Sequence, residues 1–143
     1  MECEFPTVNS TSEEITEVLN KIKTIAVMGL SPDPSKASHY VSAYMQEAGF
    51  KIIPVYPKED VILGEKVYRS LSDIPVDVDC VTIFRKPKAV GPIVDEMLTR
   101  GDVKVVWTQV GIVNNDAVQK AKDAGLDVVQ NKCLMVEHRA IKG

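Results

Sequence analysis

Five short apolar runs separated by helical patterns constrain the fold of this chain more than any single motif does. The runs cover residues 24–28, 51–56, 80–84, 103–108 and 127–130. The first run shows no polar alternation, which is typical of a strand buried on both faces. Strands that alternate with helices require a parallel sheet with right-handed crossovers. We therefore expect an α/β fold, a Rossmann-like doubly wound three-layer sandwich with a mainly parallel sheet of five or six strands.

Capping residues indicate where the first helix begins. Ser10 or Thr11 can cap an N-terminal helix, and Glu13 or Glu14 is placed to complete a capping box. We expect residues 1–21 to form a helical extension that precedes the first strand.

Apolar stripes and caps locate three of the later helices. One helix opens at Lys36 and ends near Gly49, a typical position for a C-cap glycine. Its expected buried stripe is Ala37, Tyr40, Val41, Tyr44, Met45 and Ala48. Asn114 can cap a helix that runs to Gly125, and residues 134–140 form a closing helix.

The middle of the chain carries weaker signals. Residues 60–70 suggest a loop with a short edge strand at 66–68, followed by a brief helical turn at 71–74. Residues 87–100 have a helical pattern that Pro92 should kink or restart, because proline is tolerated only in the first turn of a helix.

Composition limits the classes of function. The 143 residues are 45% hydrophobic, which describes one domain over residues 1–143 with a substantial core. No window reaches the roughly 18 consecutive apolar residues that a membrane-spanning helix needs. A net charge of −3 disfavours a nucleic-acid partner. Cys3, Cys80 and Cys133 are too few and too far apart for a disulfide framework or a zinc site, so we expect no metal and a cytoplasmic location.

Residues 24–44 combine a strand, a tight turn after Gly29 and a helix that opens at Lys36. Such a turn holds phosphates, because the unpaired N–H groups and the positive end of the helix dipole face the ligand. Pro32 and Pro34 occupy the turn, so the GxGxxG fingerprint of an NAD site is missing. The spacing of Gly29 and Lys36, without a second glycine, also fails to match a Walker A loop.

The carboxyl ends of parallel strands meet at one edge of a sheet, so residues far apart in sequence are expected to gather there. The second strand ends in Tyr56, Pro57 and Lys58 instead of the acid that would bind ribose hydroxyls, which suits an adenosine with an extra phosphate. Elsewhere, rings and cations follow the strands at Phe84, Arg85, Lys86 and Trp107. This grouping favours a pocket for a base and phosphates, although such residues at strand ends often only border the core.

The chain resembles a known family in the segments GLSPDPSKASHYV, PVYPKEDVILGEKVYRSL, VTIFRKP, VWTQVGI and KCLMVEHR. In order and spacing they are similar to the stand-alone coenzyme A-binding domain proteins, relatives of the nucleotide-binding domain of the succinyl-CoA synthetase alpha subunit. The resemblance covers residues 22–139 and implies CoA bound across the strand ends.

The resemblance also implies roles for individual residues along the bound CoA. Gly29, Leu30, Ser31 and Lys36 would hold the pyrophosphate; Tyr56 and Pro57 would flank the adenosine; Phe84, Arg85 and Lys86 would border the phosphates and the start of the pantetheine; Trp107, Gln109 and Gly111 would line its path. A separate hypothesis is that Lys58 or Lys36 reads the 3'-phosphate.

The sequence assigns no catalytic residue. His39 and His138 match the pattern of packed or surface histidines, and Cys133 is more typical of a small buried hydrophobe than of a reactive thiol, although a mixed disulfide with CoA stays open. The first hypothesis is a non-catalytic CoA or acyl-CoA carrier, sensor or regulatory module. The alternatives are a nucleotide-dependent oxidoreductase or acyl transferase, or a partner-binding subunit with a vestigial pocket. A homodimer and an unidentified protein partner are compatible with so small a sheet.

Overall fold

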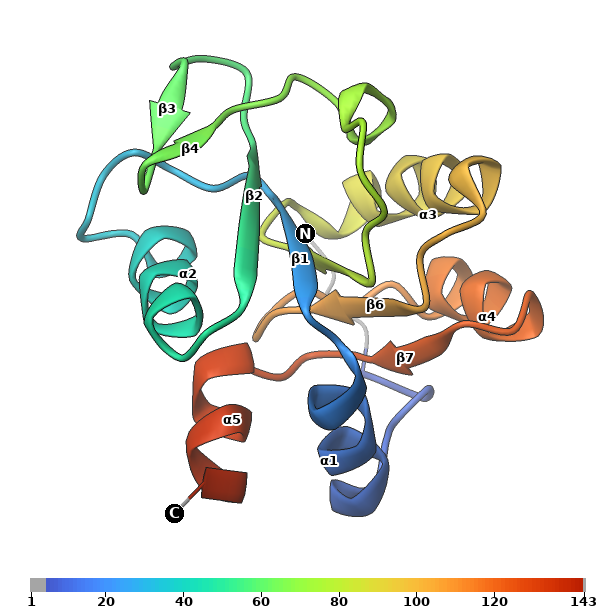
Figure 1. The fold of residues 1–143 in the computed structure, drawn as a ribbon. Helices are drawn as coiled ribbons and strands as arrows, with labels where there is room; N and C mark the ends of the chain where they lie inside the picture. Colours follow the sequence, from blue (N-terminus) through green and yellow to red (C-terminus); the bar gives the residue numbers. More distant parts are fainter. Residues whose placement is uncertain (1–4, 143) are drawn as a thin grey trace.

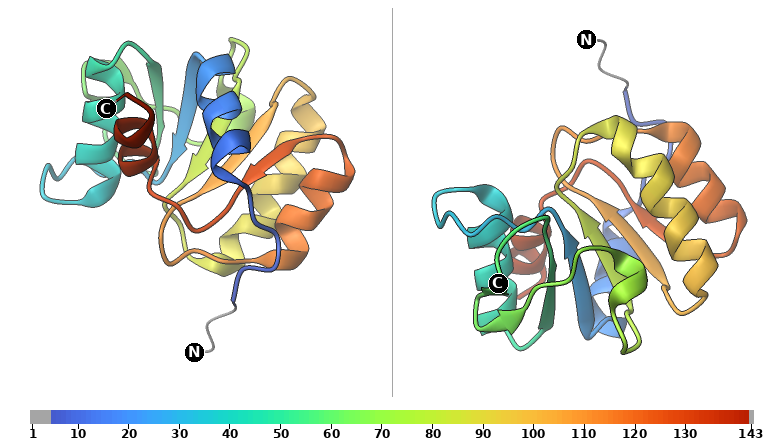
Figure 2. Two further views of the ribbon diagram at one scale, coloured as in Figure 1. Left: turned by 90° about the horizontal axis from the view of Figure 1, so that it is seen from below. Right: turned by 90° about the horizontal axis from the view of Figure 1, so that it is seen from above.

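A computed structural model describes residues 5–142 and shows a three-layer sandwich around one parallel sheet (Figures 1 and 2). The sheet has the strand order β2-β1-β5-β6-β7, and every neighbouring pair is parallel. Its strands are β1 (Thr24–Met28), β2 (Lys51–Val55), β5 (Cys80–Ile83), β6 (Val105–Thr108) and β7 (Asp127–Val129). The predicted Rossmann-like fold is therefore confirmed, with five strands in its main sheet.

Helices cover both faces of this sheet. On one face lie α1 (Ser12–Lys21), α2 (Ala37–Glu47) and α5 (Leu134–Lys142), and on the other lie α3 (Val90–Arg100) and α4 (Asn115–Asp123). Alternate residues of each strand point to opposite faces, so neighbouring residues such as Ala26 and Val27 belong to two different cores. None of the helices in residues 5–142 has the length and apolar character to cross a membrane.

The expected helix starts agree with the structure. Thr11 caps α1, and its side chain and that of Glu14 form the capping box. Asn114 caps α4 by accepting a hydrogen bond from the Ala117 N–H at 3.1 Å. Pro92 stands in the first turn of α3, after a separate 3-10 turn, η2 (Pro87–Ala89), so the helix restarts there and is not kinked.

The stripe expected for α2 is partly wrong. Its buried residues are Ser38, Val41, Ser42 and Met45, whereas Tyr40 is 47% exposed. The two serines can be buried because hydrogen bonds satisfy their hydroxyl groups: Ser42 Oγ donates to the Ser38 carbonyl at 2.6 Å, and Ser38 Oγ accepts from the Ser31 N–H at 2.9 Å. The helix is therefore rotated by about one residue from the orientation that hydrophobicity alone predicts.

The middle of the chain forms a small hairpin that the sequence did not predict. Strands β3 (Val61–Ile62) and β4 (Glu65–Lys66) pair antiparallel. Leu63 and Gly64 connect them with φ angles of 56° and 74°, the geometry of a type I′ turn. Leu63 is unusual in such a turn, so the sequence lacked the usual Asn-Gly signal. The expected edge strand at 66–68 is reduced to a parallel bridge between Tyr68 and Val55, and the expected helical turn is η1 (Leu71–Asp73).

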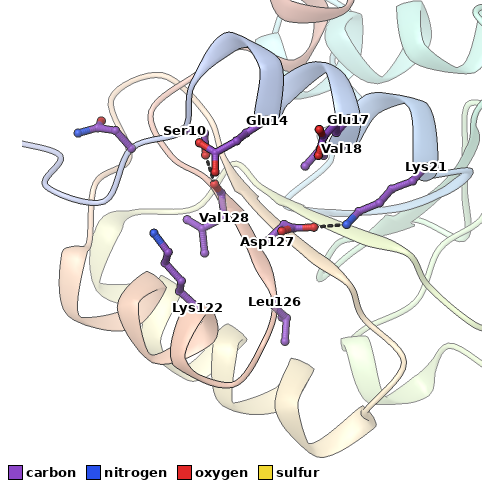
Figure 3. Close-up of a pocket in the computed structure, with 10 residues that line it drawn as sticks. Ser10, Glu14, Glu17, Val18, Lys21, Lys122, Leu126, Asp127 and Val128 are labelled. Atoms are coloured by element: carbon purple, nitrogen blue, oxygen red, sulfur yellow. Dashed lines mark hydrogen bonds and ion pairs between the residues drawn. The ribbon is translucent and has the colours of Figure 1, made fainter.

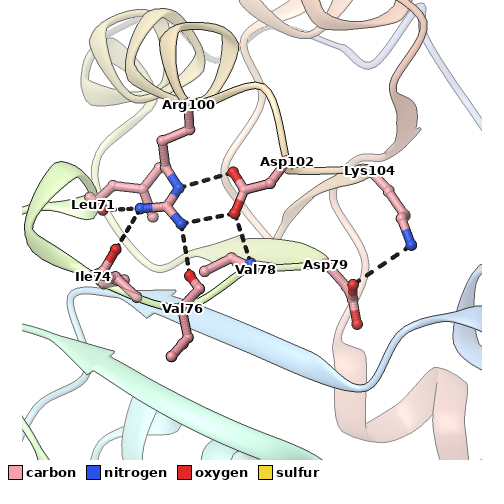
Figure 4. Close-up of polar contacts among 8 residues, drawn as sticks. All are labelled: Leu71, Ile74, Val76, Val78, Asp79, Arg100, Asp102 and Lys104. Atoms are coloured by element: carbon pink, nitrogen blue, oxygen red, sulfur yellow. Dashed lines mark hydrogen bonds and ion pairs between the residues drawn. The ribbon is translucent and has the colours of Figure 1, made fainter.

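A polar cluster holds the segment that leads into β5 against the end of α3 (Figure 4). The Arg100 guanidinium donates to three backbone carbonyls, those of Leu71, Ile74 and Val76, at 2.8–2.9 Å. It also donates twice to the carboxylate of Asp102, which lowers the pKa of that carboxyl and raises the pKa of Arg100. The two side chains are only 13% and 18% exposed, so this pair is largely shielded from solvent.

We expect Arg100→Ala to lower the free energy of unfolding by about 3 kcal/mol, because it leaves the shielded Asp102 carboxylate without its charged partner and removes the donor of the Ile74 and Val76 carbonyls. Lys104→Ala is the matched control. Lys104 is 60% exposed, and its Nζ lies 3.7 Å from an Asp79 carboxylate oxygen. Its loss should cost less than about 1 kcal/mol. Urea denaturation at pH 7 compares the two variants, and equal losses would contradict the role of Arg100.

The same cluster predicts a dependence on pH. Because the folded protein holds the pKa of Asp102 below the usual 3.8, its stabilising effect is present above that value and is lost as the pH falls further. The difference in free energy of unfolding between the wild type and Arg100→Ala should therefore become smaller as the pH falls below 3.8, which urea denaturation over a series of pH values would measure.

Candidate functional site

The carboxyl edge of the sheet contains a topological switch point between β1 and β5. These strands are neighbours, but β1 leads to α2 on one face whereas β5 leads to α3 on the other. The ladder continues one step past both strands, since Gly29 N donates to Val55 O at 2.9 Å and Phe84 N donates to Met28 O at 3.0 Å. Ligands of doubly wound sheets bind at this type of position.

Gly29 and Arg85 meet at the switch point. Gly29 has a φ of +87°, and a Cβ atom on it would lie 2.8 Å from Cδ of Arg85. The aliphatic part of Arg85 therefore crosses directly over the Gly29 backbone. Only glycine permits both this conformation and this close approach. The guanidinium of Arg85 and the ammonium of Lys86 lie on exposed residues at the same edge.

The turn between β1 and α2 is held by its own side chains. Asp33 Oδ1 accepts from the Ser35 N–H at 3.0 Å and from the Ser35 hydroxyl at 2.8 Å, and these bonds lower the pKa of Asp33. Asp33 N donates to Ser31 Oγ at 3.1 Å. His39 Nδ1 donates to the Ser31 carbonyl at 2.8 Å. His39 therefore has a structural role in shaping the turn.

Helix α2 begins without a side-chain cap. Its N-cap residue is Lys36, and its first turn contains no acidic residue. Helices α1 and α4, in contrast, are capped by Thr11 and Asn114. The first N–H groups of α2 and the exposed Lys36 thus lie at the same end of the helix, with the Asp33 carboxylate in the preceding turn.

The end of β2 places an aromatic ring beside the core and a cation outside it. Tyr56 and Phe84 are partly buried and pack against the core on the α2 face. Pro57 and Lys58 are exposed. Sequence reasoning missed Arg69, which donates hydrogen bonds to the backbone of this turn. Nothing in the sequence pattern distinguishes this arginine from an ordinary loop cation.

Three of the thirteen residues expected to bind CoA, here called the expected set, lie beneath the carboxyl edge of the sheet and not on it. Leu30 and Trp107 are 0% exposed, and Gln109 is 3% exposed. The Trp107 indole N–H donates to the Lys132 carbonyl at 2.9 Å. The Gln109 amide donates to Thr82 Oγ1 at 2.7 Å and accepts from Leu134 N at 3.3 Å. The Trp107 and Gln109 side chains therefore hold the loops at the ends of β6 and β7 from below the edge.

Gly111 lies on the exposed loop after β6, and this loop is connected to the loop after β7. Gly111 N donates to Asn131 Oδ1 at 2.7 Å, and Asn131 N donates to Thr108 Oγ1 at 2.9 Å. Asn131 has a φ of 62°, a conformation that asparagine tolerates better than most residues. The structure thus gathers ten of the thirteen expected residues at or near one edge: Gly29, Ser31, Lys36, Tyr56, Pro57, Lys58, Phe84, Arg85, Lys86 and Gly111.

The remaining titratable candidates form no recognisable catalytic group in the part of the chain that the structure describes. His138 is buried between α2 and α5, where its Nδ1 lies 2.9 Å from the Tyr44 hydroxyl. Cys80 is fully buried, and burial raises the pKa of its thiol. Cys133 is half-buried before α5, and Cys3 lies outside the described residues. Residues 5–142 contain no group of three potential metal ligands.

A separate small pocket of about 170 Å³ lies between α1 and β7 (Figure 3). Among its lining residues, the Lys21–Asp127 ion pair and a hydrogen bond from Ser10 Oγ to the Val128 carbonyl connect the α1 side of the pocket to β7. None of its lining residues belongs to the expected set. Its volume is also below the range usual for cofactor pockets.

Comparisons with known proteins identify the family of this chain. Residues 23–139, which include every strand of the sheet, match the sequence model of the CoA binding domain family. The chain belongs to this family. The domain is 41% identical over 134 residues to the uncharacterized protein YneT of Bacillus subtilis, covering 94% of this chain and 98% of that protein.

Two further relatives extend the comparison. A solved structure of a hypothetical protein from Pyrococcus horikoshii OT3 superposes with a TM-score of 0.90 at 40% identity, covering 100% of both chains. The acetate–CoA ligase (ADP-forming) II subunit alpha of Pyrococcus furiosus is 31% identical over 109 residues, which are 76% of this domain but only 24% of that subunit. The domain thus matches about a quarter of the ligase subunit.

We expect Gly29→Ala to destabilise the domain more than Gly111→Ala does. Both glycines have a φ of +87°, so each substitution should cost about 1 kcal/mol in backbone strain. Only at Gly29 would the new Cβ meet a neighbour, and displacing Arg85 should add about 1 kcal/mol. Urea denaturation measures the difference. Combining Gly29→Ala with Arg85→Ala should remove the added loss, and its persistence would contradict the close approach.

We also expect stability to decline below about pH 6.5 because of His138. Burial, and to a smaller degree the charge of Lys142, lower the pKa of His138 below its ordinary 6.5. As the pH falls past 6.5, the unfolded chain therefore binds a proton that the folded state resists, and stability is lost. His138→Gln should flatten this part of the pH profile of the melting temperature. An identical decline in the wild type and in His138→Gln would exclude His138 as the cause.

Proposed function

We propose that the domain binds coenzyme A or an acyl-CoA along the carboxyl edge of its sheet, as a carrier, sensor or regulatory module. The observation that carries this proposal is that the family match spans all five strands whose ends form the edge. The claim concerns binding, and no residue is assigned to a catalytic step. The two described cysteines are free, which favours a reducing, cytoplasmic setting.

Four cations support the binding of a polyphosphate at this edge. Lys36, Lys58, Arg85 and Lys86 are exposed, and none of them makes a salt bridge with any residue in the described range 5–142. Lys36 at a helix N-terminus is unfavourable on its own, because the positive end of the dipole repels it. A bound anion removes this repulsion and interacts with both the ammonium and the open N–H groups.

The geometry suggests how the ligand would lie. The pyrophosphate would occupy the switch point, near Gly29, Ser31 and the start of α2. The Arg85 side chain packs over the Gly29 backbone and would supply its guanidinium to the phosphates. The adenosine would extend toward the end of β2, where Tyr56 supplies a ring. The pantetheine would then leave past the half-buried Phe84 toward the loop that contains Gly111.

Isothermal titration calorimetry with CoA and dephospho-CoA tests the proposal. We expect CoA to bind more tightly, and we expect both affinities to fall with added salt because exposed charges are screened. Lys58→Ala should reduce the preference for CoA about fivefold, since Lys58 lies at the adenosine end. Lys36→Ala should instead weaken both ligands about equally.

Lys104→Ala, which removes a cation paired with Asp79 away from the expected set, is the control for net charge and should leave both affinities unchanged. Binding of neither ligand to the wild type would overturn the proposal. A preference for CoA that survives Lys58→Ala would remove the 3'-phosphate role from that residue.

A further inference from the structure

Arg69 fixes the turn at the end of β2. Its Nη1 lies 3.1 Å from the Tyr56 carbonyl oxygen, 2.9 Å from that of Lys58 and 2.8 Å from that of Glu59. Its Nη2 lies 3.7 Å from a carboxylate oxygen of the exposed Asp60. One guanidinium thus contacts the main chain on both sides of the turn that presents Lys58.

The turn needs such support, because its backbone is in an unfavourable conformation. Glu59 has a φ of +67°, which a residue with a side chain adopts only when its surroundings compensate. The remaining bonds come from the same return segment as Arg69: Tyr56 N donates to Tyr68 O at 3.0 Å, and Val67 N donates to Asp60 O at 2.9 Å. Without Arg69, the carbonyls of Lys58 and Glu59 would lose the only protein donors that the described structure gives them.

We propose that Arg69 is a positioning residue that makes the domain selective for a 3'-phosphorylated adenosine over its unphosphorylated analogue. This inference rests on the proposed function. Lys58 is exposed, and its long side chain has no salt bridge with any of residues 5–142. Such a lysine discriminates between ligands only if its backbone is held where the ammonium can reach the phosphate. The hydrogen bond from Arg69 to the Lys58 carbonyl supplies this constraint.

Arg69 acts through the turn and not as a direct phosphate ligand. Its Nη1 protons are directed at three carbonyls, and its Nη2 faces Asp60. A lysine at this position would keep the positive charge, but its side chain is one bond shorter than the path to Arg69 Nη1, so its ammonium would not reach all three carbonyls from the same backbone position. If Arg69 bound the phosphate directly, Arg69→Lys would keep the preference for CoA. If Arg69 acts by holding the turn, Arg69→Lys should lose it.

The test compares the ratio of the CoA and dephospho-CoA dissociation constants among variants, measured by calorimetry. We expect Arg69→Gln and Arg69→Lys each to lower the preference for CoA by about three- to fivefold. Arg69 is 49% exposed, so both variants should fold, and circular dichroism verifies this. Lys51→Gln is the matched control, because it removes one cation from the other end of β2. Lys51 is 56% exposed and forms a salt bridge with Glu65 of β4, so it resembles Arg69 in exposure and in having an acidic partner.

A double variant separates positioning from an independent contribution. If Arg69 acts by placing Lys58, then Lys58→Ala combined with Arg69→Gln should lose no more preference than Lys58→Ala alone. Additive losses would overturn the inference, as would a full preference in Arg69→Lys or a loss in Lys51→Gln equal to that in Arg69→Gln. A wild type that binds neither ligand would overturn the proposed function itself. A wild type that prefers CoA, with an Arg69→Gln variant that keeps the preference, would overturn only the role of Arg69.

Discussion

The candidate site depends on one constraint, the placement of β1 between β2 and β5 in a parallel sheet. Because each crossover is right-handed, a chain that reverses its winding direction must send the helices after two adjacent strands to opposite faces. Here the reversal occurs between β1 and β5, so the loops after them diverge, and Arg85 from the second loop packs over the Gly29 backbone of the first. This divergence determines where the other parts of the candidate site lie. The start of α2 follows the first loop, and Arg85 belongs to the second.

Much of the preorganisation comes from polar side chains that bind backbone instead of ligand. Asp33 holds the turn before α2, Arg69 holds the turn after β2, and Asn131 joins the loops after β6 and β7. Loops at the edge of a sheet lack a hydrogen-bonding ladder of their own, so such bonds reduce the entropy that a ligand would otherwise have to remove. Arg100 uses the same chemistry in the segment that precedes β5, where no ligand is proposed.

The fold could be predicted from sequence because its signals are local and agree with one another. Consecutive apolar residues mark the buried strands, and Thr11 and Asn114 cap helices by contacts within three residues. Predictions failed where a distant contact decided the outcome. The burial of Trp107 was likewise not evident from sequence: it lies beneath the edge because β6 is a central strand covered on both faces. Ser38 is buried only because a backbone N–H of the preceding loop needs its oxygen.

The charge distribution explains how an acidic chain can suit a polyanionic ligand. The net charge is −3, yet Lys36, Lys58, Arg85 and Lys86 stand at the same edge without salt bridges within residues 5–142. Like charges beside an uncapped helix N-terminus repel one another and the dipole, and the Asp33 carboxylate offsets part of this repulsion at Lys36. An anion that relieves the repulsion gains interactions that the unfolded chain cannot offer. If the domain binds such a ligand as proposed, its free energy of unfolding should rise with the logarithm of the ratio of ligand concentration to dissociation constant.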